Sequence, residues 1–269
     1  MGNVTKISVV TPSFNQAGFI ERTVQSVLSQ DAGVPVEHLV IDGGSTDGTL
    51  EILGRYTGKI HWISEPDRGM ADALNKGFFM ATGDVTGWLN SDDTYLPGTL
   101  RKVTEFFDAH PDVDWLYGNC RMVDASDREI RGWITAYKKH SARKYRYDKL
   151  LVENFISQPA VFMRTKAFKE AGPVDLTLPT AMDYDLWLRM ARNSRPGHIT
   201  DDLACFRVHG KSISARNYRL QFAEQYRIHK RYDHNPWRLL SHRMRNLVIV
   251  GVYSLLRASR GKAGKSRDQ

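Results

Sequence analysis

The amino-acid sequence predicts an α/β protein whose helices flank a mostly parallel sheet. Over residues 6–109, short runs rich in β-branched residues alternate with segments whose apolar residues recur at helical spacing. The chain of 269 residues is long enough for one large domain of this class with an appendage. Because each helix returns the chain across the sheet, the alternation favours strands that run parallel to one another.

The elements follow in order from these patterns. Four strands are expected, over residues 6–11, 38–41, 60–63 and 85–89. The first, KISVVT, has the composition of a buried strand, and Pro12 ends it. Four helices are expected between and after the strands, over residues 19–28, 49–56, 71–81 and 97–109.

Three polar or glycine-rich loops follow strands, at residues 12–15, 42–48 and 90–93. In a parallel sheet, ligands bind at the carboxyl ends of the strands, so we expect the three loops to form one site. Asp92 and Asp93 permit two interpretations: they cap a turn, or they bind a divalent cation, which prefers oxygen ligands. The convergence of the loops favours the second.

The net charge of +8 is concentrated in the C-terminal part of the chain. Residues 207–269 carry 15 Lys and Arg against 3 Asp and Glu, which leaves 23 against 27 for residues 1–206. Blocks of basic residues contact nucleic acids or anionic membranes, or they form a solvated helix surface. The two cysteines and the N-terminal residues, which lack the pattern of a signal peptide, predict a cytoplasmic protein without a structural disulfide.

The C-terminal tail is expected to be helical from Pro236. Its apolar run at residues 247–256 has ten residues, whereas about 20 are needed to span a bilayer. Two interpretations remain, an interfacial helix on an anionic leaflet and a helix packed on the domain with a basic end. Eight basic residues support the first: Arg238, Arg243, Arg245, Arg257, Arg260, Lys262, Lys265 and Arg267.

Five motifs resemble those of the family 2 glycosyltransferases with the GT-A fold. They are TPSFNQ at residues 11–16, IDGGSTDGT at 41–49, SEPDRG at 64–69, NKG at 75–77 and LNSDD at 89–93. The resemblance is specific because the motifs occur in the family's order at plausible spacing. It covers residues 5–215, so we expect a GT-A domain over residues 1–215 and a basic helical extension over residues 216–269.

The resemblance implies a site for a nucleotide-sugar donor, which is expected to be a UDP-sugar. The donor-binding residues that it implies are Pro12, Ser13, Phe14, Asp42, Asp67, Arg68, Asp92 and His209. Asp42 and Asp47 have a second interpretation as caps of the turn and helix that follow. The family often has a second Asp at the position of Gly43. At this position the chain departs from the family pattern, which bears on contacts with the nucleotide base and on the preference for uridine.

The resemblance also implies a divalent metal ion, Mn²⁺ or Mg²⁺, as cofactor. Asp93 is the implied direct ligand, Asp92 contacts the ribose or a metal-bound water, and His209 reaches the metal or the diphosphate. Arg207 and Lys211 beside His209 suit an anionic leaving group. This chain has Asn90 where the family often has another acidic residue, so fewer carboxylates would hold the metal.

Asp183 is the candidate general base, because the segment MDYDLW at residues 182–187 resembles the acidic motif with which the family opens a helix. A carboxylate opposite the leaving diphosphate can take the proton of the attacking hydroxyl. Asp185 is expected to interact with the helix start. Gln158 and Trp187 are the candidate acceptor-side residues, and Gln158 has a second interpretation as a partner of the backbone.

Residues 120–150 interleave basic and aromatic side chains, a pattern that single-stranded nucleic-acid binders use. In a glycosyltransferase the same pattern suits a mobile acceptor loop, which we prefer because the surrounding motifs are strong.

The resemblance thus implies an inverting, metal-dependent glycosyltransferase that acts on a saccharide or lipid-linked saccharide in cell-surface polysaccharide synthesis. The basic tail predicts that the protein lies at the inner face of the membrane. We expect no nucleic-acid partner. Two alternatives stay open, a metal-dependent nucleotidyltransferase or phosphohydrolase and a non-enzymatic binder of single-stranded nucleic acid.

Overall fold

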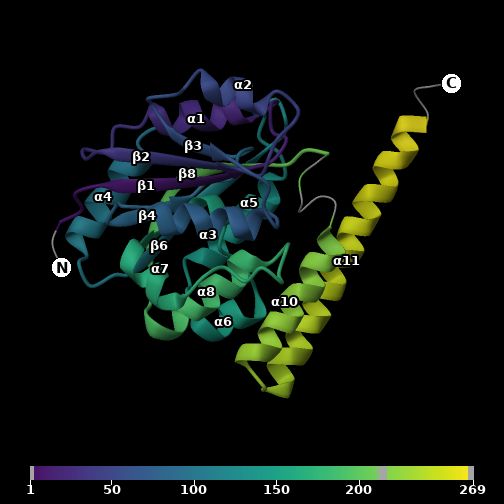
Figure 1. Ribbon diagram of the computed structural model, residues 1–269. Helices are drawn as coiled ribbons and strands as arrows, with labels where there is room; N and C mark the ends of the chain where they lie inside the picture. The colour runs from purple at the N-terminus through teal and green to yellow at the C-terminus, as the bar shows by residue number, and fades with distance from the viewer. Residues whose placement is uncertain (1–2, 211, 213–216, 266–269) are drawn as a thin grey trace.

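The computed structural model describes residues 3–210, 212 and 217–265, with side chains described as far as residue 251. Within these residues, eight strands form one sheet in the order β3-β2-β1-β4-β7-β6-β8-β5. Helices cover both faces of the sheet (Figure 1). Four of the seven strand pairings in the described chain are parallel and three are antiparallel, so the sheet is mixed.

The parallel half of the sheet holds the four strands that the sequence predicts. They are β3 (His61–Ser64), β2 (Val36–Asp42), β1 (Ile7–Ser13) and β4 (Val85–Trp88). The helices that connect or follow them are α1 (Ile20–Leu28), α2 (Thr49–Gly54), α3 (Met70–Met80) and α4 (Thr99–Ala109). All eight elements begin and end within two residues of the expected positions.

The second half of the sheet contains the antiparallel pairings. Its strands are β7 (Val161–Arg164), β6 (Trp115–Val123), β8 (Gly197–Arg207) and β5 (Thr94–Tyr95). β7 runs antiparallel to both of its neighbours, and β5 pairs with the end of β8, with Thr94 opposite Cys205. This register brings the end of β8 beside the loop at residues 90–93.

Two large apolar clusters fill the opposite faces of the sheet. Val9 and Val10 are consecutive on β1 and enter different clusters, as alternate side chains of a strand must. One cluster joins β1 to α1 and α4, and the other joins it to α3 and α8 (Met182–Asn193). In α3, a Cβ atom at Gly77 would lie 2.4 Å from Cγ1 of Val10, so the glycine permits the close approach of helix and sheet.

The aromatic segment at residues 120–150 corrects one expectation. Beyond the end of β6 it forms the helices α5 (Gly132–Ala142) and α6 (Tyr147–Val152) rather than an acceptor loop. Burial explains why this segment is helical and packed: Ala142, Leu150 and Leu151 enter the same apolar cluster as α8. The remaining elements are a short 3₁₀ turn, Gln158–Ala160, and α7 (Thr165–Ala171).

Two C-terminal helices, α10 (Tyr218–Tyr232) and α11 (Pro236–Lys265), pack side by side and against α6 and α8. The hydroxyl of Tyr232 donates to Asp185 Oδ1 at 2.9 Å, and His242 Nδ1 lies 3.0 Å from the carbonyl oxygen of Leu151. The last turns of α11 extend beyond the body of the molecule (Figure 1). The helix therefore presents one face to the domain and another to solvent.

No helix within the described residues combines the length and apolarity that a bilayer crossing requires. Lys211 and Arg267, and the side chains of Arg257, Arg260, Lys262 and Lys265, lie outside what the structure describes.

Candidate active site

Asp93 lies at the centre of the loop that follows β4. Its side chain is fully buried, its Oδ1 accepts a hydrogen bond from the backbone N–H of Arg207 at 2.8 Å, and its Oδ2 accepts one from Asn90 Nδ2 at 3.3 Å. Burial, and then the charge of Asp92, raise the pKa of Asp93 well above the ordinary value. A cation bound beside this carboxyl would lower its pKa again and favour the ionised form.

Residues at the end of β8 form hydrogen bonds with the loop that contains Asp92 and Asp93. The buried guanidinium of Arg207 donates from Nε to the carbonyl oxygen of Asp92 at 2.7 Å. His209 Nε2 lies 2.9 Å from Asp92 Oδ2. The structure therefore brings together Asp92, Asp93 and His209, the three candidate metal ligands, although more than a hundred residues separate them in sequence.

These residues fit a divalent cation as part of a larger ligand set. Carboxylate oxygens and an imidazole nitrogen are ligands that Mn²⁺ accepts, and the raised pKa of Asp93 marks a place where positive charge would be stabilising. Within the described chain, no group of three or more His, Cys, Asp or Glu side chains is arranged to hold a metal ion by itself. The diphosphate of a nucleotide could supply further oxygens.

The loops after β1 and β2 are joined to each other by hydrogen bonds. Asn15 has a φ of 53°, its N–H donates to Ser45 Oγ at 2.7 Å, and its Oδ1 accepts from Thr46 N–H at 2.9 Å. The ring of Phe14 is 59% exposed, and Ser13 Oγ is buried without a hydrogen-bond partner among the described residues. An exposed ring and an unpartnered hydroxyl are available to a nucleoside.

Asp42 contacts its own loop and the end of β3. Its fully buried carboxylate accepts hydrogen bonds from Ser45 Oγ at 2.5 Å, from the Ser45 N–H at 2.8 Å and from Ser64 Oγ at 2.7 Å. Asp47 likewise accepts from the Thr49 N–H at 3.2 Å. The contacts with the backbone of Ser45 and Thr49 are those of turns, and a direct contact of Asp42 with a donor stays a prediction.

The side chain of Asp67 lies directly beside Gly43. A Cβ atom there would lie 2.6 Å from Asp67 Oδ2, so the carboxylate of Asp67 occupies the space that a side chain at Gly43 would need. Arg68 is exposed and pairs with Asp72 at 3.1 Å. Asp67 borders the loop after β2, and Arg68 follows it in the loop after β3.

Asp183 opens α8 and lines a cavity of about 490 Å³. Burial raises the pKa of its half-buried carboxyl, while hydrogen bonds from the Tyr184 backbone and from Asn154, and the charge of Lys138, act in the opposite direction. A carboxylate whose pKa is raised is a better proton acceptor than one with the ordinary pKa. Asp185 points elsewhere: it is buried and pairs with Arg189 at 2.9 Å.

Gln158 connects the carboxylate loop to this cavity. Its Nε2 donates to the carbonyl oxygen of Trp88 at 2.6 Å, and its Oε1 accepts from Asn90 Nδ2 at 2.9 Å. The same Asn90 amide reaches Asp93 Oδ2. Gln158 lines the cavity, as an acceptor-side residue should, but both of its polar atoms serve the protein.

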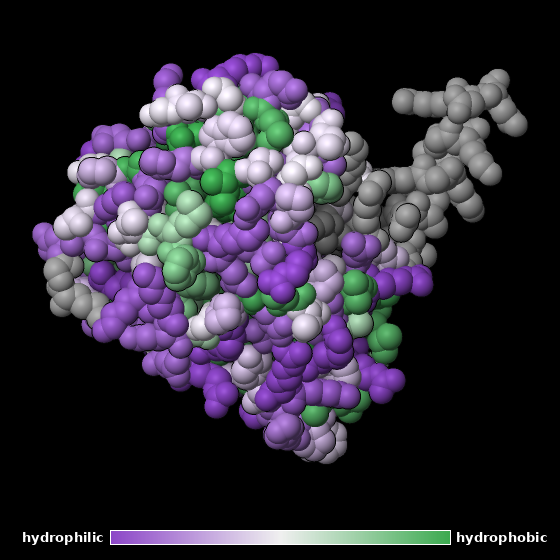
Figure 2. All heavy atoms as spheres, in the orientation of Figure 1, coloured by the Kyte–Doolittle hydropathy of each residue, from purple (hydrophilic) through white to green (hydrophobic). Residues whose placement is uncertain are grey.

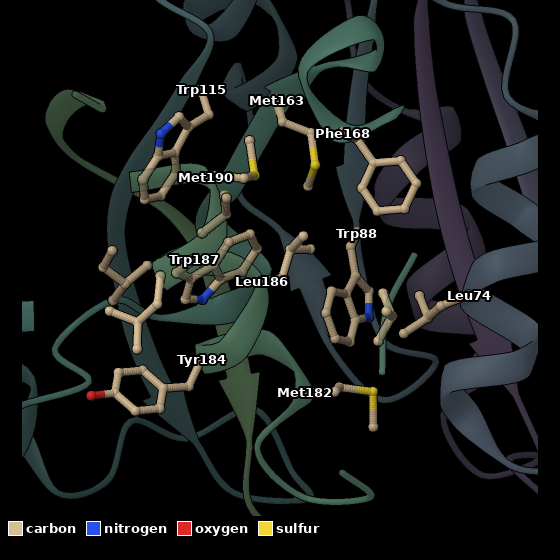
Figure 3. Close-up of a cluster of buried hydrophobic side chains, with 14 of the residues drawn as sticks. Leu74, Trp88, Trp115, Met163, Phe168, Met182, Tyr184, Leu186, Trp187 and Met190 are labelled. Carbon is tan, nitrogen blue, oxygen red and sulfur yellow. The ribbon is translucent and has the colours of Figure 1, made fainter. Parts of the chain in front are cut away.

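Trp187 corrects the other acceptor-side prediction. Its side chain has no exposed surface and stacks on Trp115 at a ring distance of 5.9 Å, inside the apolar cluster between β6 and α8 (Figure 3). The packing of α8 against the sheet accounts for the error. Trp187 follows Asp183 by four residues, and the cavity ends at the first turn of α8 while later turns face the sheet.

Several charged residues that line the cavity are not among the predicted site residues. Lys138 of α5 lies near Asp183, and Arg245 of α11 pairs with Glu153 at 2.8 Å. Lys138 belongs to the basic and aromatic run at residues 120–150, for which the sequence pattern predicts an acceptor role. Arg245 and Glu153 are ninety-two residues apart in the sequence, and the packing of α11 brings them together. No local sequence pattern predicts that packing.

Comparisons with known proteins agree on one family. Residues 8–172 match the family model described as glycosyl transferase family 2. The chain is 33% identical over 239 residues to an uncharacterized glycosyltransferase of Mycobacterium tuberculosis, covering 86% of this chain and 87% of the relative. It is 31% identical over 193 residues to a PGL/p-HBAD biosynthesis glycosyltransferase of Mycobacterium bovis, covering 69% and 70%.

Two solved structures share the fold. Staphylococcus aureus TarS in complex with UDP matches with a TM-score of 0.63 at 21% identity, over 84% of this chain and 64% of that chain. The mannosyltransferase PcManGT of Pyrobaculum calidifontis, in complex with GDP-Man and Mn²⁺, matches with a TM-score of 0.63 at 19% identity, over 97% and 80%. This chain spans less than two thirds of the TarS chain. The likeness confirms the expected GT-A architecture.

Proposed function

Because the chain belongs to glycosyl transferase family 2 and is a glycosyltransferase, we propose that it transfers a sugar from a nucleotide-diphosphate donor to an acceptor hydroxyl with inversion at the anomeric carbon. The donor would lie over the carboxylate loop after β4, and the acceptor would lie in the cavity that holds Asp183. The proposed acceptor is a saccharide or lipid-linked saccharide of the cell surface.

One observation carries this proposal: a single amide joins the two halves of the site. Asn90 Nδ2 donates both to Asp93 Oδ2 at 3.3 Å and to Gln158 Oε1 at 2.9 Å, and Gln158 lines the cavity with Asp183. The buried carboxylate of Asp93 is therefore linked by hydrogen bonds to Gln158, which lines the same cavity as the half-buried carboxylate of Asp183. Direct displacement needs this juxtaposition, since the attacking and leaving groups must face each other across one carbon.

The loops after β1 and β2 would hold the nucleoside. The exposed ring of Phe14 and the unpartnered hydroxyl of Ser13 offer an apolar face and a hydrogen bond beside the backbone of Pro12. Asp67 and the exposed Arg68 would approach the donor from the loop after β3, where a guanidinium suits phosphate oxygens. TarS was solved with UDP and PcManGT with GDP-Man, and we favour a UDP-sugar for this chain.

Asp93, Asp92 and His209 would hold a divalent cation together with the diphosphate. When bound, such an ion neutralises the diphosphate and so makes it a better leaving group. Arg207 keeps the two carboxylate residues in place, because its guanidinium donates to the carbonyl oxygen of Asp92 and its backbone N–H donates to Asp93 Oδ1.

Asp183 would act as the general base. Its carboxylate accepts the proton of the acceptor hydroxyl while the hydroxyl oxygen attacks the anomeric carbon, on the face opposite the departing diphosphate. The apolar cluster beneath α8 keeps the first turn of the helix fixed, so the carboxylate is positioned before the acceptor arrives. Met182, the residue before Asp183, is buried.

The donor half of the proposal is tested by calorimetric titration of UDP-, GDP- and dTDP-sugars, with and without Mn²⁺ or Mg²⁺. We expect one nucleotide sugar to bind wild type only with metal, and Asp93→Asn to lose that binding. Asp92→Asn, at a less buried position, serves as the second variant in case Asp93→Asn does not fold. Metal-independent binding of equal strength in wild type and both variants would remove the metal from the proposal.

A further inference from the structure

We propose that Asp127 is a positioning residue for the divalent cation and that it acts through the buried guanidinium of Arg207. This inference rests on the proposed function and adds to it a residue that none of the five sequence motifs includes. Asp127 lies in the segment between β6 and α5.

The turn that carries Asp127 is held by hydrogen bonds and an ion pair. The N–H of Asp124 donates to the carbonyl oxygen of Arg128 at 2.9 Å, and Asp124 Oδ1 accepts from the N–H of Ser126 at 2.8 Å. Arg22 of α1 pairs with Asp127 Oδ2 at 2.5 Å. Asp127 has a φ of 63°, in the left-handed region that aspartate and asparagine tolerate better than most residues. A residue keeps such a conformation only where its surroundings enforce it, so the turn presents this carboxylate in a fixed place.

Asp127 supplies the counter-ion of Arg207. The Nη2 atom of Arg207 lies 2.5 Å from Asp127 Oδ1, and among the ion pairs of the described chain this is the one that includes Arg207. Hydrophilic side chains cover much of the face of the molecule that Figure 2 shows, where water solvates their charges, whereas only 1% of the Arg207 side chain is exposed. A buried charge without a counter-ion is strongly unfavourable, so the place of the guanidinium depends on Asp127.

Arg207 in turn reaches all three candidate metal ligands, directly or through one aromatic ring. Its Nε donates to the carbonyl oxygen of Asp92 at 2.7 Å, and its backbone N–H donates to Asp93 Oδ1 at 2.8 Å. Its Cζ lies 5.5 Å from the centre of the Phe19 ring, and the centre of the His209 ring lies 4.4 Å from that of Phe19. A shift of this guanidinium would therefore move the groups that the cation requires.

The charge of Asp127 acts on the cation as well as its position does. Burial raises the pKa of Asp93, and the positive charge of Arg207 acts in the opposite direction, so the guanidinium influences the carboxyl that would bind the cation. Without the charge of Asp127, the guanidinium would be drawn toward the Asp93 carboxylate and would repel a cation there. Loss of a group that orients metal ligands typically lowers metal affinity about 10- to 100-fold.

The test titrates UDP calorimetrically into full-length wild type and variants at a series of Mn²⁺ concentrations. Asparagine also suits a positive φ, so Asp127→Asn removes the charge and keeps the turn, and Asp127→Gly is the second variant in case the first does not fold. We expect Asp127→Asn to need at least about ten times more Mn²⁺ than wild type for half-maximal UDP binding, and excess Mn²⁺ to restore that binding.

Asp202→Asn is the matched control for this test. Asp202 also lies between two basic side chains, Arg121 at 2.9 Å and Lys139 at 2.7 Å, so the variant makes the same change of charge at another ion-paired aspartate. It should need no more Mn²⁺ than wild type.

An equal Mn²⁺ requirement in Asp127→Asn and wild type, or equal increases in Asp127→Asn and Asp202→Asn, would overturn the inference. A loss of UDP binding in both Asp127 variants that excess Mn²⁺ does not restore would also overturn it, because a general structural defect has that result. Failure of the proposed function looks different: neither UDP nor GDP then binds wild type at any Mn²⁺ concentration. If either nucleotide binds wild type with Mn²⁺ and Asp127→Asn behaves as wild type does, the proposed function stands and the role of Asp127 is wrong.

Discussion

Arg207 is the residue on which the geometry of the site depends most. Its backbone N–H and its guanidinium together hold the two carboxylate residues after β4, and its Nη2 pairs with Asp127 at 2.5 Å. The sequence indicates a basic group beside His209, where it suits a leaving diphosphate. The structure gives this arginine a different task, because its guanidinium is buried and its hydrogen bonds are made within the protein.

Lys138 is expected to set the pH range in which Asp183 can accept a proton. Burial raises the pKa of Asp183 and the positive charge of Lys138 lowers it, so Lys138→Met should raise it further. A base must be ionised to act, so the acid limb of the kcat/KM profile should move to higher pH in this variant. The profile is measured against pH with saturating nucleotide sugar.

The matched control for this prediction is Lys139→Met. Lys139 is the next residue of α5 and pairs with Asp202 at 2.7 Å, outside the residues that line the cavity. It should leave the acid limb in place. An acid limb that does not move in Lys138→Met would show that the lysine does not tune Asp183.

At the scale of elements, the parallel half of the sheet is predictable and the antiparallel half is not. The first four strands alternate regularly with helices, and the period of the apolar residues is enough to place them. β6, β7 and β8 are joined by long segments that contain four helices, and their pairing is set by burial against α8. No local pattern shows that β7 runs antiparallel between β4 and β6.

The helix α11 is expected to bind an anionic lipid surface through its exposed face. Trp237, Leu240, Met244 and Leu247 recur along that face, each at least half exposed, and Arg243 borders them. Like charges on the basic helix disfavour pairing with a second copy, whereas anionic lipids complement them. The double variant Leu240→Asp with Leu247→Asp should co-sediment less with phosphatidylglycerol vesicles than wild type does.

Two controls accompany the vesicle experiment. Leu220→Asp changes an exposed leucine of α10 and should not alter co-sedimentation, and vesicles of phosphatidylcholine alone should bind wild type weakly. Undiminished binding of the double variant would exclude this face of α11 as the membrane contact.

At the scale of the whole molecule, the active site is assembled from distant parts of the chain. The sequence motifs locate Asp92, Asp93, Asp183 and His209 because each follows a strand or opens a helix at a recognisable position. The cavity around Asp183 could not be predicted, since α5, α10 and α11 enclose it only after long-range packing. Trp187 was misplaced for the same reason, because its neighbours in space decide that it is buried.

The central claim is that donor binding and proton transfer belong to separate, adjoining parts of this site. The most direct test measures nucleotide-sugar binding and sugar transfer in parallel for wild type and Asp183→Asn. We predict that the variant keeps its affinity for the donor and loses transfer by a factor of about 100 to 10,000, the usual contribution of a general base. Near-normal transfer by Asp183→Asn would contradict the account, because the cavity would then lie apart from the chemistry.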